Sequence, residues 1–490
     1  MYAATTSVAL VGGEVRAVEV QAHVGRQNDV FKLSGLPDTA VREAKDRVRA
    51  AVTSAGLRFP NRTVTVNLAP ADLPKGGTDY DLPIALGILA ASKDIPVLRR
   101  AVVVGELSLD GGVRPGHNAL GAAVLGARHD IPCLVAAGVA GEAASIPGAR
   151  AYGVSTLAEA VSLLREGLEG REPARPHEPP PALPSLDLSD IRGQLVARRA
   201  LEIAAAGGHH LLLHGPPGSG KTMLARRIGG LLPRLEVEQA IETAMLWAAA
   251  GRRRGLDQTP PFRSPHHTAS KAALVGGGSG NPVPGEASLA HNGVLFLDEL
   301  AEFPRGHLDT LRQPLEEGVV SVARRGMSVD FPASFQLLAA SNPCPCGYHG
   351  DSRRPCECRP TLRAKYRSRI SGPLLDRFDL IVRVGRVEAG EYAGPAGEPS
   401  AEVASRVARA REAQAGRGIL NRYLTPEASL ETAEAKALGA AAVGSGVLTA
   451  RGGDRVRRVA RTIADLAGVE PVEEEHMAEA IGLRGEWRDD

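Results

Sequence analysis

The segment LLLHGPPGSGKT, at residues 211–222, constrains the fold of this chain more than any other part of its sequence. Its apolar run breaks into the spacing Gly-x-x-x-x-Gly-Lys-Thr. In such a loop the glycines turn backbone N–H groups toward phosphates, the lysine carries a cation to the β and γ oxygens, and the threonine hydroxyl is a Mg²⁺ ligand. The sequence therefore predicts a strand, a phosphate-binding loop and a helix. The residues of this loop are Gly215, Pro216, Pro217, Gly218, Ser219, Gly220, Lys221 and Thr222.

Composition indicates a globular protein, because 43% of the 490 residues are hydrophobic and a chain of this length has room for about two to four domains. The 58 basic and 56 acidic residues give a net charge of only +2, so any contact with nucleic acid has to come from local basic patches. The N-terminus lacks a signal peptide pattern, and the longest apolar run, at 82–91, is about half a membrane span. We expect a cytoplasmic protein with no membrane partner.

A proline-rich stretch divides the chain. We predict a linker at 166–185, because proline and charge replace hydrophobic periodicity there. Residues 1–165 alternate strand-like and helix-like segments, as in an α/β domain. Residues 186–390 carry the phosphate-binding loop, and residues 391–490 read as amphipathic helices that form a small lid.

Two further strands end in polar residues of the kind that nucleotide hydrolysis needs. GVLFLDEL at 293–300 ends in Asp298, a candidate Mg²⁺ ligand with Thr222, and Glu299, a candidate activator of the attacking water. FQLLAASNP ends in Asn342, whose amide would orient the same water. The alternative for Asn342 is an ordinary turn residue before Pro343.

Arginines later in the chain are candidates for stabilising the γ-phosphate in the transition state. Arg367, Arg369 and Arg377 lie in YRSRISGPLLDRFDL, and an arginine from a neighbouring subunit often supplies this charge. Arg451, at the start of a lid helix, is a candidate to reach the phosphates as well. For each of these arginines the alternative is a solvated helix face.

Four cysteines cluster in CPCGYHGDSRRPCEC: Cys344, Cys346, Cys356 and Cys358. In a cytosolic protein four such thiols favour Zn²⁺ over disulfides, and a zinc ion would fix the loop that follows Asn342. The spacer inside each pair is one residue instead of the usual two, so reduced loop cysteines, or a labile disulfide, remain alternatives.

With these motifs in place, the sequence resembles the bacterial ComM/YifB family of AAA+ ATPases, which are often labelled magnesium-chelatase-like. The resemblance runs through TVNLAPADLPKGGTDYDLPIALGILAAS, FRSPHHTASKAALVGGGS, SNPCPCGYHGD and VARTIADLAG. It implies an ATP-hydrolysing hexamer with Asp298 and Glu299 as Walker B, Asn342 as sensor one, Arg377 as arginine finger and Arg451 as sensor two. It further implies a DNA motor of the branch-migration type that acts in natural transformation; the alternative is a chelatase-like remodeller of a protein partner.

Residues 316–335 read as two strands around a basic tip with Arg324 and Arg325, between Walker B and sensor one. This segment resembles the pore hairpin of related helicases, for which backbone phosphates of DNA are natural ligands. The alternative is an ordinary exposed hairpin that carries charged residues.

The N-terminal region resembles the Lon protease domain, whose fold is related to domain 2 of ribosomal protein S5. Lon-type proteases use a Ser–Lys dyad, but GGTDYDLPIAL contains no serine and GGVRPGHNALGAA contains no lysine. Thr78 and Lys75 do not match the positions of the dyad. We therefore expect an α/β chain with a non-proteolytic Lon-like domain, an AAA+ P-loop core and a C-terminal helical lid.

Overall fold

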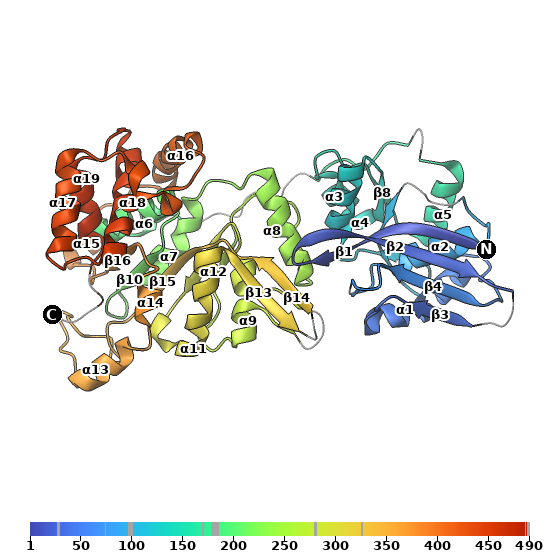
Figure 1. The fold of residues 1–490 in the computed structure, drawn as a ribbon, viewed down its shortest axis with the longest axis horizontal. Coiled ribbons are helices and arrows are strands. Elements are labelled where there is room, and N and C mark those ends of the chain that lie inside the picture. The colour runs from blue at the N-terminus through green and yellow to red at the C-terminus, as the bar shows by residue number, and fades with distance from the viewer. Residues whose placement is uncertain are drawn as a thin grey trace.

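The computed structural model describes residues 1–26, 30–73, 75–96, 101–168, 171–177, 186–278, 282–324, 327–485 and 487. Figure 1 shows an N-terminal α/β part, a central part built on a second sheet, and a C-terminal group of helices packed on the far side of that sheet. Of the predicted linker, residues 171–177 contain no helix or strand, and residues 169–170 and 178–185 lie outside the described part.

A mixed sheet organises the N-terminal part. Its longest element is an antiparallel hairpin in which Tyr2 pairs with His23 and Val11 with Glu14, around a turn at Gly12 and Gly13, both of which have positive φ. The strand order is β3-β4-β2-β1-β5-β8-β9. The strands are β1 (Tyr2–Val11), β2 (Glu14–Val24), β3 (Phe31–Ser34), β4 (Val64–Ala69), β5 (Val102–Val103), β8 (Cys133–Ala136) and β9 (Ala151–Val154), with β6 (Glu106–Leu107) and β7 (Val113–Arg114) as a separate ladder.

Helices cover this sheet. The apolar run at 82–91 lies in α2, all of whose residues are buried, so it forms the centre of the core. Helix α1 begins after Asp38, whose carboxylate accepts a hydrogen bond of 2.8 Å from the backbone N–H of Val41. The helices are α1 (Thr39–Ser54), α2 (Asp81–Ala91), α3 (Ala119–His129), α4 (Ala137–Ala144) and α5 (Leu157–Glu166).

The central sheet is parallel throughout and has the order β11-β12-β15-β10-β16. Its strands are β10 (Leu211–His214), β11 (Phe262–Arg263), β12 (Val294–Leu297), β15 (Gln336–Ser341) and β16 (Leu380–Arg383), and a separate hairpin is formed by β13 (Val319–Arg324) and β14 (Met327–Pro332). The strands β10, β12, β15 and β16 are short, mostly apolar runs that are largely buried, as expected for a parallel sheet covered by helices, whereas the edge strand β11 is half-buried. Because β15 lies between β10 and β12, the carboxyl ends of these three strands meet at one edge of the sheet.

The remaining elements surround that sheet. In the core they are η1 (Leu188–Asp190), α6 (Leu195–Gly207), α7 (Lys221–Arg226), η2 (Arg227–Gly230), α8 (Val237–Ala249), α9 (Lys271–Val275), α10 (Glu286–Leu289), η3 (Leu300–Glu302), α11 (Arg305–Leu308), η4 (Asp309–Leu311), α12 (Arg312–Glu317), α13 (Pro360–Arg367) and α14 (Gly372–Leu375). The C-terminal part contains α15 (Ala389–Ala393), α16 (Ser400–Gly416), η5 (Asn421–Tyr423), η6 (Pro426–Ser429), α17 (Ala433–Gly444), α18 (Ala450–Ala467) and α19 (Glu474–Gly482).

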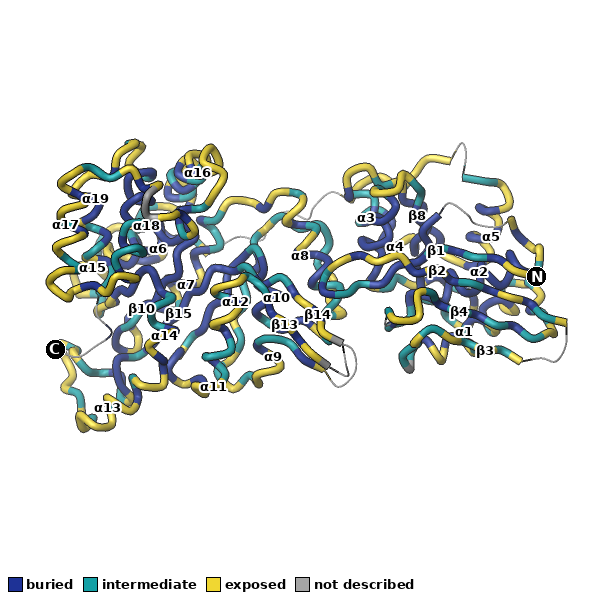
Figure 2. Tube along the Cα trace, viewed as in Figure 1, coloured by how far each residue is buried: buried dark blue, intermediate teal, exposed yellow. Residues whose placement is uncertain are grey.

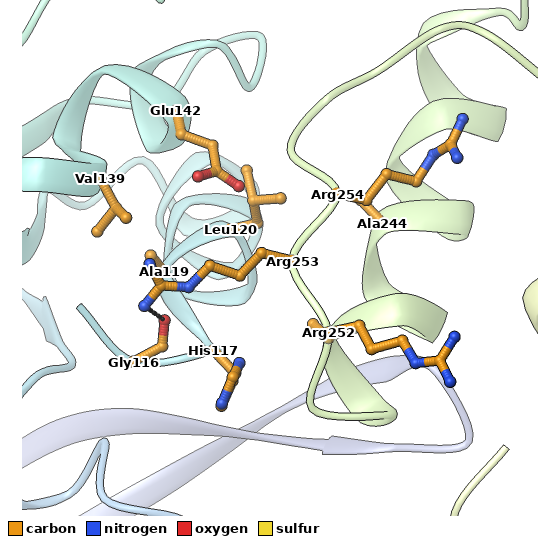
Figure 3. A pocket seen from close by; sticks show the side chains of 11 residues that line it. Gly116, His117, Ala119, Leu120, Val139, Glu142, Ala244, Arg252, Arg253 and Arg254 are labelled. Carbon is orange, nitrogen blue, oxygen red and sulfur yellow. Dashed lines mark hydrogen bonds between the residues drawn. The ribbon is translucent and has the colours of Figure 1, made fainter.

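Helix α8 joins the two sheets. Ala244 and Met245 are buried in the N-terminal core, whereas Leu246 belongs to the core beneath the central sheet. After the helix, Arg253 reaches back and donates a hydrogen bond of 3.1 Å to the carbonyl oxygen of Gly116, as Figure 3 shows. A helix that follows the phosphate-binding loop in sequence thus completes the core of the N-terminal domain.

No helix in the described residues is long and apolar enough to cross a membrane.

Candidate nucleotide-binding and hydrolysis site

The phosphate-binding loop connects β10 to α7, as the sequence predicts. Gly218 and Gly220 have φ values of +77° and +91°, which favour glycine and let the loop turn its backbone. Gly215 is needed for a different reason, because a Cβ there would lie 2.0 Å from the carbonyl oxygen of Val384. Helix α7 ends at Arg226 and continues as a 3₁₀ turn through Gly229 and Gly230.

Lys221 is buried at the start of α7. Its ammonium donates hydrogen bonds of 2.8 Å to the carbonyl oxygens of Gly215 and Pro216 and lies 3.3 Å from Oδ1 of Asn342. Burial lowers its pKa to about 8, and the charge of Asp298 opposes this shift only in part. Carbonyl oxygens therefore hold the ammonium beside the loop. Phosphate oxygens, which are negatively charged, would be stronger ligands for it than these carbonyl oxygens.

Thr222 and Asp298 come together from two elements. The Thr222 hydroxyl, on the first turn of α7, donates a hydrogen bond of 2.8 Å to Oδ2 of Asp298, directly after β12. A hydroxyl and a carboxylate oxygen are the protein ligands that Mg²⁺ takes when phosphates supply the others. The donor set at this edge of the sheet fits Mg²⁺ bound with a nucleotide.

Glu299 follows Asp298 in the left-handed region, with φ of +53°, and this conformation directs it away from its neighbour. Its Oε2 lies 3.0 Å from Nδ1 of His267, and its side chain is 54% exposed. A carboxylate in this position is accessible to water, which a general base requires. His267 therefore lies at the site, and its contact with Glu299 joins residues 32 positions apart that no local sequence pattern connects.

Asn342 lies one residue beyond β15, between the loop and the Asp298 strand, because His214 pairs with Ser341 and Leu297 with Ala339. The sheet order thus brings Lys221, Asp298 and Asn342 to one edge. A residue that only formed a turn before Pro343 would not need to lie beside Lys221 and Asp298.

The candidate arginines are dispersed. Arg367 donates to the carbonyl oxygen of Pro343, and Arg369 donates hydrogen bonds of 3.0 Å to the carbonyl oxygen of Ala301 and to Oε2 of Glu302. Arg377 is largely buried and forms an ion pair with Glu316.

Arg377 lies in a region of positive charge. Burial lowers the pKa of Arg377, and the neighbouring charges of Arg455, Arg312 and Arg451 lower it further. Arg455 connects α18 to this region by donating to the carbonyl oxygen of Arg377 at 3.2 Å and to Oδ1 of Asp379 at 2.6 Å. Among the contacts of the described residues, none joins Arg377 or Arg451 to the phosphate-binding loop of the same chain.

The four clustered cysteines converge. The Sγ atoms of Cys344 and Cys346 are 3.3 Å apart, and each lies 3.6 Å from Sγ of Cys356. The sulfurs of these three and of Cys358 all lie within 4.8 Å of one another. Tetrahedral Zn²⁺ with bonds of about 2.3 Å places sulfurs about 3.8 Å apart, whereas a disulfide needs about 2.05 Å. The cluster fits zinc and contains no disulfide.

This cysteine loop contacts the nucleotide site directly. Gly347 has φ of +84°, and a Cβ there would lie 2.7 Å from Cδ of Pro217 in the phosphate-binding loop. On its other side the loop is held by Asp351, whose carboxylate accepts a hydrogen bond of 2.6 Å from Nε of Arg386. The same hydrogen bond is the largest of the effects that lower the pKa of Asp351 to about 2.

The predicted basic hairpin is present as β13 and β14, with Arg324 paired to Met327. Arg325 lies outside the described residues, and the side chain of Arg324 is also outside them. Their contacts with DNA stay a prediction.

Comparison with known proteins places this geometry in a class. Residues 187–392 match the family model for magnesium chelatase, subunit ChlI, residues 18–138 match subunit ChlI of Mg-chelatase, and residues 397–484 match the ChlI C-terminal region. These matches and the motifs at the sheet edge define an AAA+ ATPase related to magnesium chelatase.

The chain belongs to the ComM/YifB family within that class. It is 42% identical to YifB of Escherichia coli over 97% of this chain and 96% of the relative. It is also 42% identical to the competence protein ComM of Haemophilus influenzae, over 98% of this chain and 96% of the relative. A weaker likeness, 28% identity over 36% of this chain, joins it to Lon protease 2 of Bacillus subtilis. Membership implies ATP hydrolysis with Mg²⁺.

Proposed function

We propose that this protein is a hexameric AAA+ motor that hydrolyses ATP to move DNA, as a branch-migration helicase in recombination or natural transformation. One observation supports ATP hydrolysis most directly: the residues that this reaction needs lie together at one edge of the central sheet. They are Lys221, Thr222, Asp298, Glu299 and Asn342. DNA as the substrate is supported by the similarity to the competence protein ComM and by the hairpin of β13 and β14 with its basic tip.

Hydrolysis would proceed by in-line attack of water. Lys221 binds the β and γ oxygens, Thr222 and Asp298 hold Mg²⁺, and Glu299 accepts the proton of the water that Asn342 orients. His267 positions Glu299. The transition state still needs positive charge on its γ-phosphate, which Arg377 would supply to the nucleotide of a neighbouring subunit, with Arg451 as sensor two.

Mixed hexamers test this action between subunits. Arg377→Ala subunits should bind ATP normally but lower the turnover of wild-type partners, so that activity falls more steeply than the wild-type fraction. ATP hydrolysis measured across a mixing series checks this. A linear decline would show that Arg377 does not act between subunits, and Arg369→Ala and Arg367→Ala in the same series would then identify the residue that does.

We further propose that the four cysteines bind one structural zinc ion that fixes the loop against Pro217. Freshly purified protein should contain about one zinc per chain, and Cys356→Ser with Cys358→Ser should lose the metal and lower ATP hydrolysis. Cys133→Ala, in the N-terminal core, is the matched control and should keep both. Folded wild-type protein without stoichiometric zinc would exclude this site.

The N-terminal domain serves as a scaffold in this proposal. The Thr78 hydroxyl donates to Oε2 of Glu106 and the Lys75 ammonium to the carbonyl oxygen of Pro70, so neither is arranged to activate the other. Nucleophilic catalysis requires such a pairing. Its absence at these two residues supports a non-proteolytic role.

ATP hydrolysis with and without forked DNA tests the function as a whole. We expect DNA to stimulate hydrolysis several-fold at moderate salt. The match to chelatase subunit models favours one other function, an ATP-dependent remodeller of a protein partner. Absence of both DNA binding and stimulation, together with recovery of a chelatase-type partner, would support that function instead.

A further inference from the structure

A strongly basic segment follows the cysteine cluster. Residues 353–369, which we call the basic arm, contain seven of the chain's 58 Lys and Arg but one of its 56 Asp and Glu. The rest of the chain therefore has 51 basic and 55 acidic residues. Positive charge is concentrated in this segment of a chain that is otherwise slightly acidic.

Three cations of the basic arm are available to a ligand. Arg353, Arg359 and Lys365 are exposed, and no described contact engages their side chains. Other cations have structural partners, such as Arg354, which stacks 4.2 Å from the ring of Tyr348, and Arg369, which pairs with Glu302. Figures 1 and 2 show α13 projecting from the core with a largely exposed surface.

The basic arm has a defined shape despite its exposure. The carboxylate of Asp351 accepts hydrogen bonds of 2.8 and 2.9 Å from the backbone N–H groups of Arg353 and Arg354. The cysteine cluster encloses these two arginines between Cys346 and Cys356, and Arg359 follows the cluster directly as the residue before α13. Charges held on a fixed loop lose less entropy when they bind a ligand.

We propose that the basic arm is a second DNA-binding surface, which contacts backbone phosphates through Arg353, Arg359 and Lys365. This inference rests on the proposed DNA motor and adds a contact outside the pore hairpin. Exposed Arg and Lys side chains that have no acidic partner are suited to bind backbone phosphates. Such contacts carry no sequence preference. A protein partner fits less well, because Leu362 is the one large apolar side chain exposed on α13 and protein interfaces need an apolar centre.

The test is replacement of Arg353, Arg359 and Lys365 by Gln in the full-length chain. Fluorescence anisotropy with a labelled 30-nucleotide single strand should show affinity weakened about 100-fold at 0.1 M salt. The slope of log affinity against log salt should shrink by about 2, since each phosphate contact on a single strand contributes about 0.7. ATP hydrolysis without DNA should not change.

Two companion variants make the result specific. Arg58→Gln, Arg62→Gln and Arg128→Gln remove the same charge from exposed positions of the N-terminal part and should bind DNA as wild type does. Arg353→Lys with Arg359→Lys keeps the charge and should keep the affinity. Unchanged DNA affinity and an unchanged salt slope in the Gln variant would overturn the proposed second surface. DNA binding by the wild type would still support the proposed motor.

Two other results would also be decisive. Loss of the hexamer and of DNA-independent hydrolysis in the Gln variant would assign the basic arm to an acidic surface of a second copy instead of DNA. Wild-type protein that binds no DNA would reject the proposed function itself.

Discussion

Glu299→Gln is expected to stop ATP hydrolysis while ATP still binds. The amide keeps the size of the side chain but cannot accept the proton of the attacking water, and loss of a general base typically costs about 10²- to 10⁴-fold in rate. Binding should persist because Lys221, Thr222 and Asp298, which would contact the phosphates and Mg²⁺, keep their arrangement at the start of α7 and the end of β12. Single-turnover hydrolysis and the Kd for a fluorescent ATP analogue measure the two effects separately.

His267 provides the graded comparison. Its Nδ1 lies 3.0 Å from Oε2 of Glu299, so His267→Ala should lower the rate by less than Glu299→Gln, because the base remains and only its position is lost. His267→Asn, which keeps a hydrogen-bonding group, should recover part of the loss. A Glu299→Gln protein that hydrolyses ATP within a few-fold of wild type would show that another group activates the water.

The elements of this site were predictable because each motif is local. Gly215 to Thr222, Asp298 and Asn342 each follow a short apolar run, and parallel strands align their carboxyl ends without further information. The hairpin at 319–332 was also evident from the sequence, and the apolar run at 82–91, too short to span a membrane, lies in the buried helix α2. In each case the local preference and the tertiary structure agree.

Contacts between distant segments were not predictable. Nothing in VEQAIETAMLWAA shows that Ala244 and Met245 complete the N-terminal core while Leu246 packs beneath the central sheet, because periodicity defines an apolar face but not its partner. The pairing of His267 with Glu299 is missed for the same reason. Residues 102–107 likewise form two short strands, β5 and β6, separated at Val104 and Gly105, where a Cβ on the glycine would lie 3.0 Å from Val113.

Tertiary contacts also connect the lid helix of Arg451 to the segment that contains Arg377. Sequence position suggests that Arg451 reaches phosphates from the lid of its own chain. In the structure, Arg455 of the same helix α18 donates a hydrogen bond to the carbonyl oxygen of Arg377, so the lid helix that carries Arg451 contacts the segment of the candidate arginine finger. The roles of Arg377 as arginine finger and of Arg451 as sensor two stay predictions.

Lys221→Ala should weaken ATP binding by at least about 100-fold. Hydrogen bonds to charged groups contribute about 1.5–3 kcal/mol each, and Lys221 supplies the cation for two phosphates. The variant also leaves the carbonyl oxygens of Gly215 and Pro216 without their donor, so its melting temperature must be compared with wild type. Thr222→Ala is the matched control, because it should affect Mg²⁺-dependent binding and leave binding without the metal intact.

The pKa of Lys221 gives the same residue a test without mutation. Burial lowers that pKa to about 8, and only the protonated side chain attracts phosphate, so ATP affinity should fall as pH rises through 8. The Kd for a non-hydrolysable analogue should increase toward tenfold per pH unit above that value, because ATP itself has finished titrating by then. The dependence should vanish in Lys221→Ala. A Kd that stays constant between pH 8 and 9.5 in wild type would mean that Lys221 of the free protein keeps its proton throughout this range, contrary to a pKa lowered to about 8 by burial.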